Sequence, residues 1–119
     1  MPGKGRAHGT VAMPELRRGR VALCFATLLA RSTGRPVPQL DYASPARCYG
    51  VAQGQLAYYA ALEREGYARV ITRLAALDHH VAEWEAWDTA CQAGAGEVPP
   101  VGLVISMESA DPMAAASAP

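Results

Sequence analysis

The segment Val101-Gly-Leu-Val-Ile-Ser-Met-Glu-Ser-Ala-Asp-Pro112 decides how the rest of the chain is interpreted. It is an apolar run of strand length that ends at a carboxylate, Glu108, and a turn follows at once. In α/β proteins the reactive groups lie where strands end, at the carboxyl edge of the sheet. The segment therefore predicts a buried strand that presents Glu108 as a candidate catalytic or metal-binding acid. A solvated strand end, or a charge at the start of a following helix, is the alternative.

Upstream segments predict further strands and helices. Residues 20–29 form a near-continuous apolar run, which is typical of a strand covered on both faces, and residues 69–72 form a shorter one. Helices are predicted over residues 51–65, where Gly66 follows as a left-handed terminator, and over residues 74–91. Strands alternating with helices predict a parallel sheet with right-handed crossovers.

The domain organisation follows from composition. Residues 1–13 are Gly-rich and basic and are predicted to be a disordered N-terminal segment, and residues 113–119 a disordered tail. Residues 14–112 form one α/β domain, in which residues 31–47, rich in proline, are a long loop.

Composition also limits the partners. Eleven basic and eleven acidic residues cancel, which argues against a general attraction for nucleic acid or anionic lipid. The apolar run at residues 21–30 is about half as long as a membrane span, so no membrane partner is expected. Cys24, Cys48 and Cys91 are too scattered for a disulfide framework or a CxxC zinc site, which favours a reducing cytoplasm.

The second predicted helix contains a cluster that resembles a metal site. Adjacent histidines in Asp78-His79-His80 point about 100° apart on a helix, so they do not readily share one metal. His79 and Glu83 could supply two ligands, but no third lies nearby in sequence. We therefore predict a solvated helix face there. The opposite, buried stripe is predicted to comprise Leu74, Leu77, Val81 and Trp84.

Other candidate patterns are weaker. Tyr58, Tyr59, Trp84 and Trp87 lie at helical spacings, which favours core packing over an aromatic binding surface. The glycines form no phosphate-binding motif, and no serine lies in a G-x-S-x-G elbow.

Three segments together resemble a known family. They are Pro14-Glu-Leu-Arg-Arg-Gly-Arg-Val21 with the following Cys-Phe-Ala-Thr-Leu-Leu-Ala-Arg-Ser32, the helix from Ala52 to Gly66, and Ser106-Met-Glu-Ser-Ala-Asp-Pro112. In this order they resemble the renal (membrane) dipeptidase family of zinc metallopeptidases, in its bacterial branch. The resemblance spans about residues 11–112 and implies an N-terminal partial fragment.

The resemblance implies a (β/α)₈ barrel that holds two zinc ions at its carboxyl end and hydrolyses dipeptides. The family's Met-Glu-Gly-Ala-Asp-Pro segment supplies the glutamate that bridges the metals, and here it matches Glu108. Two zinc ions share a hydroxide and stabilise the oxyanion of the attacked peptide bond.

The chain departs from the family pattern in its ligands. A His-x-Asp motif is expected upstream, but Thr10 stands near His8 instead of Asp, so no ligand role is assigned to His8. Ser109 stands where the family has Gly. The remaining histidine ligands come from later strands, so Glu108 alone is expected to survive as a metal ligand.

The sequence therefore predicts a partial (β/α)₈ TIM barrel of about three parallel strands and two helices. Its inherited function is that of a zinc-dependent dipeptidase, expected to be inactive alone because a zinc site needs three or four protein ligands. A complementing chain or a homo-oligomer would have to supply the others. The alternative is a non-catalytic α/β module that self-associates or binds a partner through its open edges.

Overall fold

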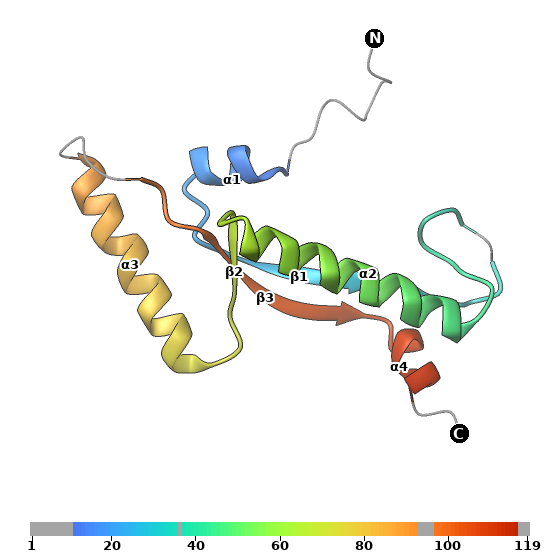
Figure 1. The fold of residues 1–119 in the computed structure, drawn as a ribbon. Coiled ribbons are helices and arrows are strands. Elements are labelled where there is room, and N and C mark those ends of the chain that lie inside the picture. Colours follow the sequence, from blue (N-terminus) through green and yellow to red (C-terminus); the bar gives the residue numbers. More distant parts are fainter. Residues whose placement is uncertain (1–10, 36, 93–96, 117–119) are drawn as a thin grey trace, which may run out of the picture.

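A computed structural model describes residues 11–35, 37–92 and 97–116 of the chain. The predicted termini at residues 1–10 and 117–119 lie outside the described residues. The elements follow one another as helix, strand, helix, strand, helix, strand and helix (Figure 1). They are α1 (Met13–Arg18), β1 (Leu23–Leu29), α2 (Pro45–Arg64), β2 (Ala68–Val70), α3 (Leu74–Gln92), β3 (Val101–Glu108) and α4 (Asp111–Ala116).

The three strands form one parallel sheet in the order β1-β3-β2. The predicted α/β class with three parallel strands is therefore confirmed. β3 is central and pairs with β1 from Gly102 to Glu108, whereas β2 opposes only Val101 to Leu103. The sheet of the described residues is open, and the third strand lies between the first two. In a closed (β/α)₈ barrel each strand lies beside the strand that precedes it in the chain. The observed order β1-β3-β2 differs from that arrangement.

Helix boundaries differ from the predicted ones where local capping decides them. α2 begins at Pro45, inside the predicted loop, because the Ser44 side chain accepts a hydrogen bond from the Arg47 N–H and Pro45 occupies the first turn. It ends as predicted, with Gly66 at a φ of 82°. The predicted turn before β1 contains the short helix α1, and α4 includes part of the predicted tail.

The two faces of the sheet are covered unequally. Ala26, Ala68, Val101 and Leu103 form the core, and side chains of α1 and α2 pack against it. α2 runs along the sheet, while α3 stands beyond its amino end (Figure 1). On the opposite face Phe25 is 74% exposed. One face of the sheet is therefore a packed core, and much of the other is open.

The predicted buried stripe of α3 is wrong at Leu74 and Val81 and confirmed at Trp84. Leu74 is 73% exposed and Val81 is also exposed, whereas His80 is fully buried and Trp84 nearly so. His80 packs over Gly102, because the missing side chain of β3 leaves room for the imidazole. The helix therefore buries a polar residue that its sequence pattern assigns to solvent.

Candidate functional site

Glu108 is the last residue of β3, at the carboxyl edge of the sheet. Its partner in the parallel ladder is Leu29, the last residue of β1, and its side chain is exposed. Two positions earlier on the same face, the hydroxyls of Thr27 and Ser106 lie 2.8 Å apart across the two strands. A carboxylate and a hydroxyl pair thus lie along one open face of neighbouring strands.

The turn after Glu108 has an unusual backbone. Ser109 has a φ of 72°, a left-handed conformation that favours glycine. Its hydroxyl accepts a hydrogen bond from the Asp111 N–H at 3.2 Å, which offsets part of the strain. The Gly-to-Ser difference from the resembling family therefore falls where the backbone itself favours Gly.

Asp111 joins this turn to the loop after β1. Its Oδ2 accepts a hydrogen bond from the Ser32 N–H at 2.7 Å. Within that loop, buried Asp41 accepts hydrogen bonds from the Thr33 N–H and hydroxyl, and it lies 3.5 Å from the Arg31 guanidinium. The two carboxylates hold the loops at the carboxyl edge in place. Neither carboxylate was predicted from the sequence as a site residue, although Asp41 is a polar residue in a proline-rich loop and therefore a candidate anchor.

Cys48 lies buried beneath these carboxylates. Burial raises the pKa of its thiol, and the negative charges of Asp111 and Asp41 raise it further. A thiol kept protonated in this way is a poor nucleophile and a poor metal ligand. Cys48 therefore acts as a small packing residue.

The histidine cluster of α3 does not form one solvated face. His79 is exposed, but His80 accepts a hydrogen bond at Nδ1 from the Arg69 guanidinium (3.0 Å) and donates one from Nε2 to the Ala22 carbonyl (2.7 Å). Both ring nitrogens are occupied by the protein, so His80 is a structural residue. It lies at the amino end of the sheet, opposite to Glu108.

The Glu83 carboxylate also has a partner within the protein. The Arg69 guanidinium lies 2.7 Å from its carboxylate, and this hydrogen bond lowers the Glu83 pKa. A metal held by His79 and Glu83, the pair considered from the sequence, would therefore have to compete with Arg69 for the Glu83 carboxylate.

The four aromatic residues differ in their burial. Trp84 is buried and donates a hydrogen bond to the Pro100 carbonyl at 2.9 Å, while Trp87 packs edge-on against it. Tyr59 is partly buried against the core, but Tyr58 is 62% exposed. The predicted core packing therefore holds fully for Trp84 and in part for Trp87 and Tyr59, whereas Tyr58 is mostly exposed.

The residues at the carboxyl edge do not fit a zinc site by themselves. Among the described residues no group of three or more His, Cys, Asp or Glu side chains is placed to hold a metal ion. Glu108 shares its face with Thr27, Leu29 and Ser106, none of which is a usual zinc ligand. His8 lies outside the described residues.

No family model, curated protein or solved structure matches this chain. Within the described part of the chain, none of the helices has the length and apolar character that a membrane span requires.

Proposed function

We propose that this chain is part of a zinc-dependent dipeptidase and contributes Glu108 as one metal ligand. The observation that carries the proposal is the position of Glu108, an exposed carboxylate at the carboxyl end of the central parallel strand. The resemblance of the Ser106–Pro112 segment to the dipeptidase family's metal-bridging segment supports the same role. The remaining zinc ligands have to come from outside the described residues.

The partial-barrel interpretation places β1 and β3 as two successive barrel strands. They pair in parallel over seven registered positions, whereas the three-residue β2 lies at the edge and is an accessory strand. The free thiols of Cys24, Cys48 and Cys91 suit a reducing compartment, and we propose the cytoplasm.

The test is zinc-dependent dipeptide hydrolysis, measured with the zinc content and the mass of each species in solution. We expect turnover only in an assembly that completes the ligand set, and we expect Glu108→Ala to abolish it. Glu85→Ala is the matched control, because Glu85 is an exposed acid on α3. Zinc-dependent turnover that Glu108→Ala leaves unchanged would disprove the proposal.

The second candidate is a non-catalytic module that self-associates or binds a partner. The exposure of Leu23 and Phe25, two positions apart on the open face of β1, favours it, because adjacent exposed apolar side chains mark interfaces. It predicts a metal-free oligomer or complex whose assembly is unaffected by Glu108→Ala and weakened by Phe25→Ser. A monomer at all concentrations would contradict self-association.

A further inference from the structure

One helix caps the outer edges of the sheet. The side chain of Gln55 bonds both main-chain groups of Leu29, at 3.0 and 2.9 Å, and the Tyr59 hydroxyl donates to the Thr27 carbonyl at 3.4 Å. Glu63 accepts a hydrogen bond from the Val70 N–H of β2 at 2.7 Å. The three side chains are four residues apart, so they share one side of α2. These contacts occupy edge groups that would otherwise pair with another strand.

The residues that the structure describes place no such cap on the second half of β3. The Val101 N–H donates to the Tyr67 carbonyl, and the Leu103 carbonyl accepts from the Ile71 N–H. Because main-chain groups alternate in direction along a strand, those of Ile105 and Met107 point to the same edge. Among the described residues they have no partner there, since β2 ends at Val70 and the chain turns away into α3.

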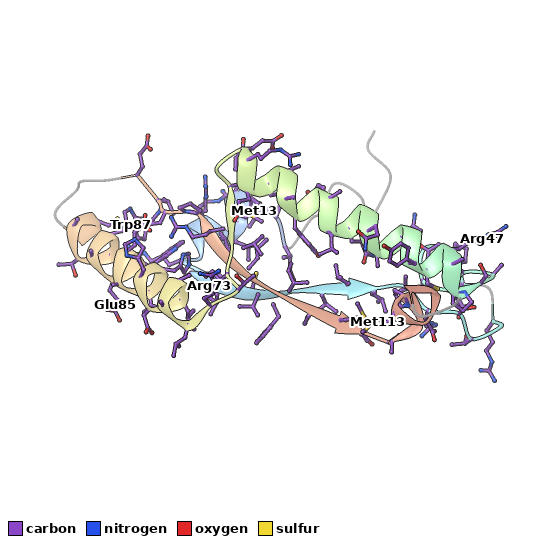
Figure 2. The ribbon with its side chains drawn as sticks, turned by 60° about the horizontal axis from the view of Figure 1, so that its bottom comes forward. Met13, Arg47, Arg73, Glu85, Trp87 and Met113 are labelled. Carbon is purple, nitrogen blue, oxygen red and sulfur yellow. The ribbon has the colours of Figure 1, made fainter. Side chains whose placement is uncertain are left out.

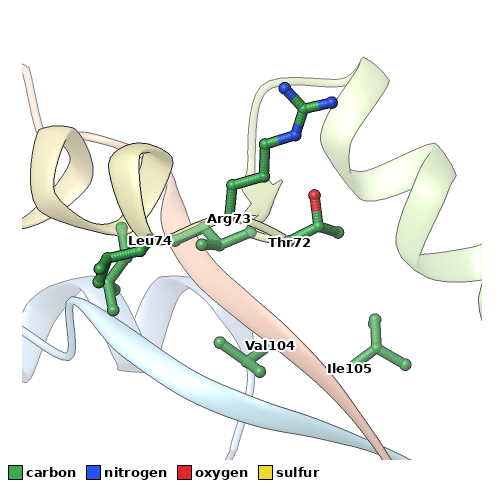
Figure 3. A pocket seen from close by; sticks show the side chains of 7 residues that line it. Thr72, Arg73, Leu74, Val104 and Ile105 are labelled. Carbon is green, nitrogen blue, oxygen red and sulfur yellow. The ribbon is translucent and has the colours of Figure 1, made fainter.

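An apolar hollow of about 450 Å³ lies beside this open edge (Figure 3). Ile71, Leu74 and Leu77 line it from the β2–α3 side, and Val104 and Ile105 line it from β3. On the other face, a smaller hollow of about 110 Å³ borders Met107. Side chains of an added strand alternate between the two faces, so each hollow can receive some of them.

The two ends of the open edge carry opposite charge. Arg73 stands at the rim beside Ile71, exposed, with its guanidinium extending away from Val104 and Ile105 (Figure 3). It precedes the amino end of α3, whose first turn contains no acidic residue. Glu108 stands at the other end of the edge. Neither Arg73 nor Glu108 has an ion-pair partner among the residues that the structure describes.

We propose that this edge binds a short extended peptide with free ends, running antiparallel to β3. Its main chain pairs with Ile105 and Met107, its carboxylate meets Arg73, and its amino group meets Glu108. The positions from Ile105 to Glu108 accommodate about four residues in extended form. The flexible Arg73 side chain turns toward the bound carboxylate. This inference does not depend on the dipeptidase proposal and concerns the metal-free chain, because a Glu108 carboxylate that binds zinc is not free to pair with the peptide's amino group.

A second copy of the chain is a poorer occupant. Antiparallel pairing of two β3 strands through Ile105 and Met107 would place Glu108 of one copy opposite Val104 of the other. The position beside Val104 is already taken by Ile71, because Val70 pairs with Leu103 and Ile71 is the next residue of the chain. A peptide that ends at Ile105 avoids this overlap.

The probe is the tetrapeptide Ala-Leu-Ala-Leu with free ends, and its affinity for the full chain is measured by calorimetry. Two further probes carry an amide at the carboxyl end or an acetyl group at the amino end. We expect saturable binding of the free peptide, weakened about tenfold by either modification because a charge-assisted contact is lost. Absence of saturable binding, or equal binding of all three peptides, would overturn the proposal.

Variants then test each contact. Arg73→Ala is expected to weaken binding of the free peptide but not of the amidated one. Glu108→Gln is expected to weaken binding of the free peptide but not of the acetylated one. Arg47→Ala is the matched control, since Arg47 is exposed on α2, far from Arg73 (Figure 2). Met107→Pro removes an N–H that points to the open edge, and it should abolish binding while Met107→Leu retains it. Thermal unfolding confirms that each variant is folded; a folded Met107→Pro variant with unchanged affinity would refute strand addition.

Discussion

A Cβ atom at Gly102 would lie 2.6 Å from Nε2 of His80, so the buried imidazole occupies the space that a side chain on β3 would need. The same nitrogen is 2.7 Å from the Ala22 carbonyl, just before β1. His80 thus ties α3 to both long strands at the amino end of the sheet. At the opposite end, with Glu108, none of the helices in the described part of the chain covers the same face in this way.

Gly102→Ala is expected to destabilise the chain by about 1–3 kcal/mol, because the methyl group overpacks against His80 and two apolar side chains. The control is Gly50→Ala in α2, where nothing lies within 4 Å of the added Cβ. That change should stabilise the helix by about 0.5–1 kcal/mol. Urea unfolding followed by circular dichroism measures both. Equal effects of the two substitutions would show that His80 does not pack as described.

Ser109→Gly is expected to stabilise the chain by about 1 kcal/mol, since glycine adopts the left-handed backbone without strain. Ser109→Ala keeps the strain and loses the hydrogen bond to the Asp111 N–H, so it should be slightly less stable than the native chain. Unfolding free energies of the three proteins give the order. A destabilised glycine variant would contradict the expected strain at this turn.

Glu83→Gln should lower the unfolding free energy at neutral pH by at most about 1 kcal/mol, because the ion pair with Arg69 is partly exposed. The Arg69 hydrogen bond lowers the Glu83 pKa from its ordinary 4.5, so the native carboxylate is stabilising above that pH. This contribution is lost as the pH falls through the lowered pKa. The difference between native and variant chains should therefore narrow below pH 4.5.

Glu85→Gln serves as the control for this pH series, because Glu85 is exposed on the same helix and has no ion pair among the described residues. Urea unfolding at several pH values should give the same free energy as the native chain throughout. If the difference in unfolding free energy between the native chain and Glu83→Gln widened in acid, the assignment of the pKa shift to Arg69 would be disproved.

Gln55→Ala should destabilise the chain by about 1–2 kcal/mol, because both main-chain groups of Leu29 lose their partner. The uncapped edge of β1 should also increase self-association, which light scattering detects. Gln53→Ala, an exposed position on α2, is expected to change neither property. Identical behaviour of the two variants would show that Gln55 does not protect the edge.

Local features of the fold were predictable because they depend on neighbouring residues. The apolar run that ends at Glu108 predicts β3, and the structure confirms a strand from Val101 to Glu108. Gly66 terminates α2 as expected, since a left-handed residue after a helix favours glycine. The start of α2 was missed because a serine cap and a following proline within a proline-rich segment also suit a loop.

The surroundings of the candidate site were less predictable. The position of Glu108 at a strand end follows from the sequence, but the hydroxyl pair of Thr27 and Ser106 depends on the register between β1 and β3. The link between Asp111 and Ser32 joins segments that are 79 residues apart. Sequence periodicity contains no information about such register.

The sequence alone determined the alternation of strands and helices, the parallel α/β class and the carboxylate at the end of β3, because these follow from local periodicity and capping. Only the tertiary structure decided that β3 lies between β1 and β2, that His80 is buried while Leu74 is exposed, and that Ile105 and Met107 face an open edge. Burial and strand pairing depend on which distant segments meet. A glycine on β3 admits the histidine, and the early end of β2 leaves the edge free.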